Sequence, residues 1–116
     1  MEKFMFIVRE DLKWVNRMTA EEREAAIQEM VRWTQSIIES GNYLGGDPLF
    51  TTGRYVTHDQ VLSDGPFIEA KEGVSGYMML LAENINQAAA IAQSCPRVQR
   101  NEMVIEVRPV IIMDHA

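Results

Sequence analysis

The pattern of apolar and polar positions predicts four strands along this chain of 116 residues. Short apolar runs rich in aromatic and β-branched side chains are typical of buried strands and occur at 3–8 and 76–83. A third strand is expected at 43–50, broken by a loop at 45–48, where the sequence Gly-Gly-Asp-Pro has the chemistry of a turn. Strict alternation at 103–110 predicts the last strand.

Two segments have the spacing of helices. Thr19 and Glu22 form a capping box, which predicts a helix over about 20–40. Asn84 is placed to cap a second helix that Pro96 ends. The first helix is expected to turn one apolar stripe to the core: Ile27, Met30, Val31, Ile37 and Ile38.

A hairpin is predicted at 52–63, with arms at 54–57 and 61–63. If it is an insertion, the remaining order is β-α-β-β-α-β, which predicts an α+β fold of the ferredoxin-like class with an antiparallel sheet and both helices on one face. The strand at 76–83 is apolar on both faces. Two copies packed sheet to sheet would bury the second face, so we expect a homodimer.

Composition and charge exclude several classes of protein. The net charge is -6 and the 11 basic residues are scattered, which argues against nucleic acid as a partner. The apolar runs are too short to span a membrane, and acids flank the first of them, which is unlike a signal peptide. We therefore expect a single cytoplasmic domain. Cys95 is the only cysteine and the two histidines are far apart, so no disulfide, metal site or bound cofactor is predicted.

The stretch "SDGPFIEAKEG" at 63–73 begins the most distinctive block of the sequence. Together with the apolar strand and alanine-rich helix that follow, it resembles the YCII-related proteins, and within them the subgroup named for its Asp-Gly-Pro-Phe motif. An apolar first strand, the acidic helix start "MTAEERE" and the ending "IEVRPV" are also similar. The residues that match are Asp64, Gly65, Pro66, Phe67, Glu69, Lys71, Glu72, Gly76, Tyr77 and Pro96.

The resemblance implies a ferredoxin-like protomer that pairs as a dimeric α+β barrel, with a cleft in each subunit. Relatives with known roles act on small organic molecules by lyase, isomerase or dehalogenating chemistry, and some members of the subgroup are encoded beside sigma factors. Shorter members carry a His-Asp pair with its histidine on the first helix, and this chain has no histidine there. Ser75 also replaces a glycine of the pattern.

Asp64 has two interpretations. An Asp before Gly-Pro accepts backbone hydrogen bonds in a tight turn. Alternatively, the carboxylate points into a cleft and acts as a general acid or base, its pKa raised by partial burial beside Phe67.

The charges that follow are also open to two interpretations. In an extended segment Phe67, Glu69 and Lys71 share one face, where Glu69 and Lys71 could hold an anion or shuttle a proton. They could equally form a salt bridge at the rim that contributes little stability. For Glu72 we favour the solvated edge.

Other candidates lie on or near the hairpin. Arg54 could bind a carboxylate through two hydrogen bonds, with Tyr55, Phe67 and Lys71 as further ligand contacts. His58 and Asp59 resemble a catalytic pair, but their place at the hairpin tip favours a turn. Trp14 and Trp33 could line a pocket or belong to the core.

The sequence thus favours a small-molecule-binding protein. It could be a cofactor-independent enzyme that performs isomerase or lyase chemistry on a small organic acid or phenol, with Asp64 as acid and base. The alternative is a non-catalytic module that senses a metabolite or binds a protein partner, linked to transcription regulation.

Overall fold

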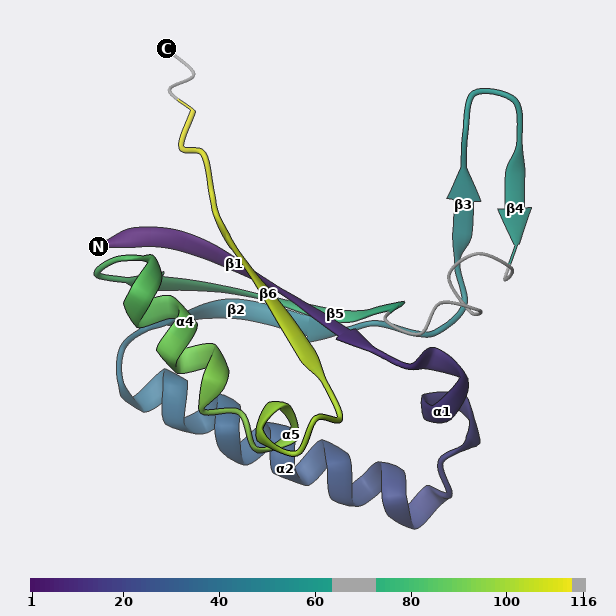
Figure 1. Cartoon of the computed structure of the whole chain (residues 1–116), viewed down its shortest axis with the longest axis horizontal. Helices are drawn as coiled ribbons and strands as arrows, with labels where there is room; N and C mark the ends of the chain where they lie inside the picture. Colours follow the sequence, from purple (N-terminus) through teal and green to yellow (C-terminus); the bar gives the residue numbers. More distant parts are fainter. Residues whose placement is uncertain (64–72, 114–116) are drawn as a thin grey trace.

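The structure is a computed structural model that describes residues 1–63 and 73–113. A four-stranded antiparallel sheet forms its centre, and a separate two-stranded hairpin leaves one end of it (Figure 1). The elements in chain order are β1 (Glu2–Glu10), α1 (Leu12–Arg17), α2 (Ala20–Glu39), β2 (Tyr43–Pro48), β3 (Arg54–Val56), β4 (Val61–Ser63), β5 (Gly73–Ala82), α4 (Ile85–Gln93), α5 (Pro96–Gln99) and β6 (Val104–Pro109).

The sheet has the strand order β2-β5-β1-β6. Its central strands β5 and β1 pair along their whole length, and α2, α4 and α5 lie on one face (Figure 1). This confirms a mixed α+β architecture with an antiparallel sheet, and the order is compatible with a ferredoxin-like fold. The hairpin of β3 and β4 is an insertion between β2 and β5, as the sequence predicted.

The core lies between the helices and one face of the sheet. Alternate residues of the two central strands, such as Phe4, Phe6 and Leu80, are completely buried there. Trp33 of α2 packs on the same cluster, and its Nε1 donates a hydrogen bond of 3.0 Å to Ser94 Oγ. Cys95 is fully buried in the same cluster.

The predicted helix signals are present. Thr19 and Glu22 form the reciprocal capping box at the start of α2, with hydrogen bonds of 2.9 and 3.1 Å. Asn84 caps α4 by accepting from the N–H of Gln87 at 2.9 Å. Pro96 follows the end of α4, as predicted. It also occupies the first turn of an additional short helix, α5.

Only part of the predicted apolar stripe of α2 faces the core. Met30, Trp33 and Ile37 pack against the sheet. The second stripe lies about a quarter turn around the helix and is about half exposed: Ile27, Val31 and Ile38. The single stripe expected from the sequence is therefore two stripes with different environments.

The predicted loop at 45–48 is wrong. These four residues belong to β2, where they pair with 76–79 of β5. A β-carbon on Gly46 would meet the carbonyl oxygen of Tyr77 and lie 2.8 Å from Met78 Cα. The glycine is needed here for the close approach of two strands and not for a turn.

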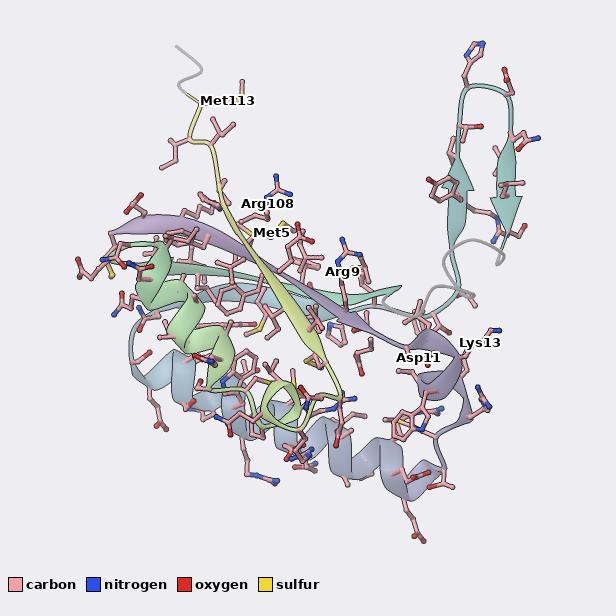
Figure 2. All side chains as sticks on the ribbon, in the orientation of Figure 1. Met5, Arg9, Asp11, Lys13, Arg108 and Met113 are labelled. Carbon is pink, nitrogen blue, oxygen red and sulfur yellow. The ribbon has the colours of Figure 1, made fainter. Side chains whose placement is uncertain are left out.

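The sheet face turned away from the helices is partly apolar, and we call it the open face. No helix covers it in the part of the chain that the structure describes (Figure 1). Figure 2 shows Met5, Arg9 and Arg108 on this side. By strand alternation the half-buried apolar residues of the open face are Met5, Ile7, Tyr77, Met79 and Leu81.

Candidate functional site

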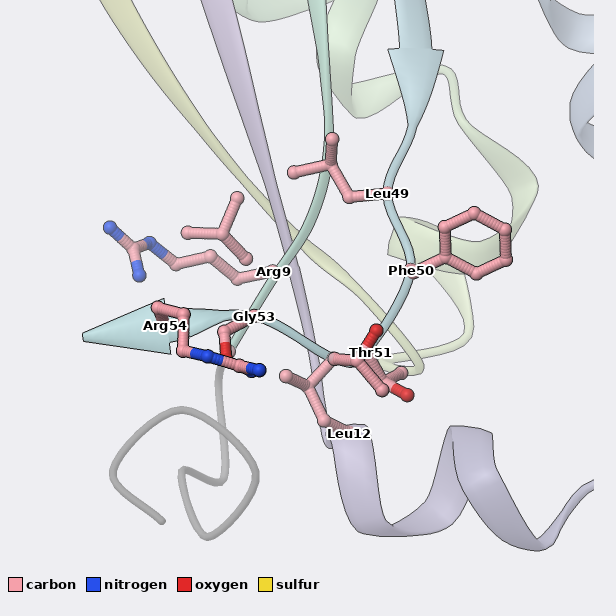
Figure 3. Close-up of a pocket in the computed structure, with 10 residues that line it drawn as sticks. Arg9, Leu12, Leu49, Phe50, Thr51, Gly53 and Arg54 are labelled. Atoms are coloured by element: carbon pink, nitrogen blue, oxygen red, sulfur yellow. The ribbon is translucent and has the colours of Figure 1, made fainter. Parts of the chain in front are cut away.

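A hollow of about 350 Å³ lies where the hairpin leaves the sheet (Figure 3). Its volume is within the range of small-molecule sites. It is lined by the end of β1, the start of β5, the start of α1 and the loop from β2 to β3. The lining residues used below are Arg9, Leu12, Leu49, Phe50, Arg54 and Val74.

Arg9 reaches the hollow from the end of β1, opposite a bulge in β5. The register between β1 and β5 shifts between Val8 and Arg9, so that Val8 pairs with Gly76 while Arg9 pairs with Val74. The extra residue is Ser75 of β5, and it brings Val74 opposite Arg9. Bulges re-aim the side chains of their own strand and are common next to binding sites. The guanidinium of Arg9 lies 3.2 Å from Glu106 Oε1 on β6. Arg9 is thus held at the border between the hollow and the open face.

Arg54 comes from the first residue of β3. Its Nη1 donates a hydrogen bond of 2.9 Å to the carbonyl of Gly53. No carboxylate pairs with Arg54 among residues 1–63 and 73–113. In the view of Figure 3, Arg9 and Arg54 lie on one side of the hollow and Phe50 on the other. The arrangement offers positive charge on one side and apolar surface on the other.

Two hydrogen bonds fix the loop between β2 and β3. The N–H of Leu49 donates to the carbonyl of Ser75 at 2.9 Å, which continues the pairing of β2 with β5. Thr51 Oγ1 lies 2.7 Å from Asn16 Oδ1 on α1. The loop is therefore attached at Leu49 and at Thr51, on either side of Phe50.

Two groups of the open face, outside the lining of the hollow, have shifted pKa values. Hydrogen bonds from Arg108 and then from Arg9 hold the pKa of Glu106 below its usual range. On β5, Tyr77 donates a hydrogen bond of 2.8 Å to Asp47 Oδ2 of β2, and that carboxylate raises the pKa of the phenol. Both groups keep their ordinary charge states near neutral pH.

The sequence-predicted residues fall into two groups. Arg54 lines the hollow, and Tyr55 does not belong to its lining. His58 and Asp59 lie at the exposed hairpin tip, 3.7 Å apart, which fits the turn that we predicted. Asp64, Phe67, Glu69 and Lys71 lie outside the described residues, so their roles stay predictions. Glu72 also lies there.

Sequence reasoning missed Arg9 and Phe50. Neither has a motif around it, and only the pairing of distant strands brings them to the hairpin base. The one signal in the sequence for Phe50 was an aromatic residue close to residues with turn chemistry. It is 92% exposed here.

A second hollow of about 270 Å³ lies beside α1 and α5. It contains Trp14, which is half exposed, and the buried guanidinium of Arg97. Arg97 pairs with Glu10 at 2.7 Å and with Glu102 at 3.3 Å. Since these charges satisfy one another, the cluster joins α5 to β1 and we assign it to stability.

A family comparison complements this geometry. The model of the YCII-related domain matches residues 3–114, nearly the whole chain. The chain belongs to the YCII-related domain family. A search of curated proteins found no match. The hollow, the open face and the hairpin are therefore features of a YCII-related domain.

In the part of the YCII-related domain that the structure describes, no helix is long and apolar enough to cross a membrane. The same residues contain no cluster of three histidine, cysteine or acidic side chains that could hold a metal ion.

Proposed function

We propose that the hollow at the hairpin base binds a small organic anion with an apolar body. The observation that carries this proposal is that Arg9 and Arg54 line a hollow of about 350 Å³ together with apolar side chains. Ligand sites combine mostly apolar walls with a few charged groups that set orientation. An aromatic or branched carboxylic acid, or a phenolate, has this combination.

Arg54 has the leading role in the proposed site. A guanidinium can donate two parallel hydrogen bonds to a carboxylate, and such charge-assisted pairs are among the strongest polar contacts in proteins. Leu12, Leu49 and Val74 would contact the apolar body of the ligand.

We expect benzoate to bind this site, and Arg54→Ala to raise its dissociation constant at least about tenfold, the effect of losing one charge-assisted pair. Amide resonances of Gly53 and Gly73, which line the hollow, provide the readout in an NMR titration. Their shifts should saturate with benzoate and change much less with benzamide, which has the same ring and no charge.

The matched control is Arg23→Ala, an exposed arginine on α2 that does not line the hollow. It makes the same change in net charge and should leave the benzoate affinity unchanged. Equal affinity of the wild type and Arg54→Ala would contradict the assignment of Arg54. Absence of binding of benzoate, phenylacetate and short aliphatic acids to the wild type would contradict the site.

The finer proposal is that the protein belongs to the Asp-Gly-Pro-Phe subgroup and that Asp64 performs acid and base chemistry on the bound anion. Proton transfer, isomerisation or elimination would fit, with Glu69 and Lys71 assisting. Support comes from the sequence motif and from Gly73, the first described residue after the motif segment, which lines the hollow.

Asp64→Asn tests whether the carboxylate serves function or a turn. A functional carboxylate usually costs stability, so we expect the melting temperature to stay the same or rise. The measurement is thermal unfolding at neutral pH, with the oligomeric state checked for both proteins. A fall of about 4–8 °C, the effect of losing about 1 kcal/mol in a small domain, would show that Asp64 chiefly stabilises a turn.

The proposed assembly is a cytoplasmic homodimer in which two ferredoxin-like protomers pair through their open faces as a dimeric α+β barrel. The support is the apolar content of that face, on which Met5 lies opposite Met79 and Ile7 opposite Tyr77. The polar residues at its edge carry both signs of charge, as a self-complementary patch requires.

One observation favours a second function as a protein-interaction module. Ile27 and Val31 of α2 are 48% and 55% exposed, and Ile38 continues their stripe on a surface that the proposed dimer does not use. Exposed apolar stripes on helices are recognised by partner helices. Such a module could sense the bound anion and connect it to transcription regulation.

A further inference from the structure

The hairpin of β3 and β4 is exposed on both of its faces. The pair Val56–Val61 lies on one face and the pair Tyr55–Leu62 on the other. Val56 and Val61 are 69% and 66% exposed. Within the described residues the two strands contact chiefly each other and stand clear of the main sheet (Figure 1). An isolated two-stranded hairpin is at best marginally stable in water, so this one needs a covering surface.

A second apolar segment leaves the sheet at 111–113. Val110 is still attached to β1 through a hydrogen bond of 2.9 Å from its N–H to the carbonyl of Lys3. After it come Ile111, Ile112 and Met113, of which Ile111 is 84% exposed. Figure 1 shows this segment and the hairpin on the same side of the sheet, opposite the helices and at different ends.

The size of the surface indicates what should cover these segments. The accessible surface of the chain is 7983 Å², whereas a monomer of 13.2 kDa is expected to expose about 6,400 Å². The radius of gyration is 15.5 Å, compared with about 13 Å for a compact domain of this length. The excess of about 1,600 Å² is within the area that each subunit of an obligate dimer buries.

The position of the segments favours a second copy of this chain as the occupant. Both project beyond the open face, and a copy seated on that face would lie between them. The covering surface would then be continuous with the proposed dimer interface. Each copy would also supply both an apolar hairpin and an apolar tail, so a twofold dimer could bury all four apolar segments.

We infer that the hairpin and the segment 111–113 are arms that grip the second protomer of the dimer. The inference rests on the proposed pairing through the open face and adds the elements that hold the pair together. It also places the anion-binding hollow, which lies at the root of the hairpin, at the border between the two subunits.

The test replaces the pair Val56–Val61 by Val56→Lys and Val61→Glu in one variant. These residues are directly opposite each other, so the new charges can pair across the strands and keep the hairpin formed. The apolar face is lost. We expect the dimer dissociation constant, measured by sedimentation velocity, to rise at least about tenfold. The far-UV circular dichroism of the subunit should be unchanged, because the hairpin packs little on its own sheet.

The control is Ile27→Glu with Val31→Lys on α2. It replaces two residues of similar exposure by an oppositely charged pair at helical spacing, on the far side of the molecule, and should leave the dissociation constant unchanged. A second reference is Met79→Glu, which places a charge on the open face and should also dissociate the dimer.

The outcomes separate the inference from the assembly on which it rests. If Met79→Glu dissociates the dimer and the hairpin variant does not, the dimer pairs through the open face as proposed, and the inference that the hairpin holds the second protomer is wrong. If the wild type is monomeric throughout the micromolar range, both are overturned. The anion site is decided independently by the titration of Arg54→Ala.

Discussion

Replacing Arg97 by alanine is expected to lower the free energy of unfolding by about 3–5 kcal/mol, the cost of breaking a buried ion pair from one side. The side chain of Arg97 is 6% exposed and that of its partner Glu10 is 10% exposed, with 2.7 Å between Nη2 and Oε1. Removing the guanidinium leaves the carboxylate of Glu10 buried without its countercharge. Urea unfolding followed by circular dichroism measures the loss.

Arg100→Ala is the matched control for this prediction. Arg100 is 47% exposed on its side chain and pairs with Glu29 and Glu102 at 2.6–2.8 Å. Its hydrogen bonds hold the pKa of both carboxyls below their usual range. Because water screens exposed pairs, we expect a loss of at most about 1 kcal/mol. Equal losses for the two variants would show that water reaches Glu10 once Arg97 is removed.

A double variant identifies the source of the loss. Arg97→Met keeps the apolar stem of the side chain and removes the charge. If the unpaired carboxylate of Glu10 causes the loss of stability, Glu10→Gln in the Arg97→Met background should recover part of the free energy of unfolding. A cycle of the two single variants and the double variant then gives the coupling between Arg97 and Glu10 directly.

The strands at the centre of the sheet could be predicted because their pattern is local. In β1 the continuous apolar run from Phe4 to Val8 is visible in the sequence itself, whereas the burial of Phe4 and Phe6 but not of Met5 is set by the position of the helices. The capping box of α2 is equally local, since it involves only Thr19 and Glu22. These features depend on neighbours along the chain and not on the fold.

The α2 stripes show where this reasoning ends. Helical spacing identifies apolar residues but does not say which of them meet the sheet. Trp33 and Ile37 face the core, whereas Val31 is exposed. The two apolar stripes point in different directions from the helix axis, so only one of them can pack against the sheet. Which stripe is buried is decided by the position of the sheet, a tertiary property.

The candidate site was only half predictable for the same reason. Arg54 was identified because a guanidinium on a hairpin arm is a plausible anion ligand. Arg9 lines the same hollow only because β1 pairs with β5, whose shifted register puts Val74 opposite it. Arg97 was missed because Pro96 was interpreted as the end of one helix, although it also begins the next.

The prediction at Gly46 was wrong because the sequence around it has the composition of a turn. The sequence Gly-Gly-Asp-Pro resembles a turn because glycine and proline favour turns. In the structure Gly46 pairs with Met78 inside the sheet. An added β-carbon would meet backbone atoms of β5, which cannot move aside as the end of a flexible side chain can.

We therefore expect Gly46→Ala to lower the free energy of unfolding by about 3 kcal/mol, at the upper end of the usual cost of overpacking. The control is Gly41→Ala. Gly41 has a φ of 81°, and its added β-carbon would meet no atom within 4 Å. That variant carries only backbone strain, of about 1 kcal/mol. Urea unfolding of both proteins gives the comparison.

Gly46→Ala should also affect the anion site, because β2 leads directly into the loop that lines the hollow. Displacing β2 from β5 would weaken the hydrogen bond between Leu49 and Ser75 that fixes this loop. Benzoate should then bind more weakly to Gly46→Ala and with unchanged affinity to Gly41→Ala. A variant that loses no more stability than Gly41→Ala would mean that β2 can shift away from β5 at little cost. In that case the pairing of the two strands would not depend on glycine at this position.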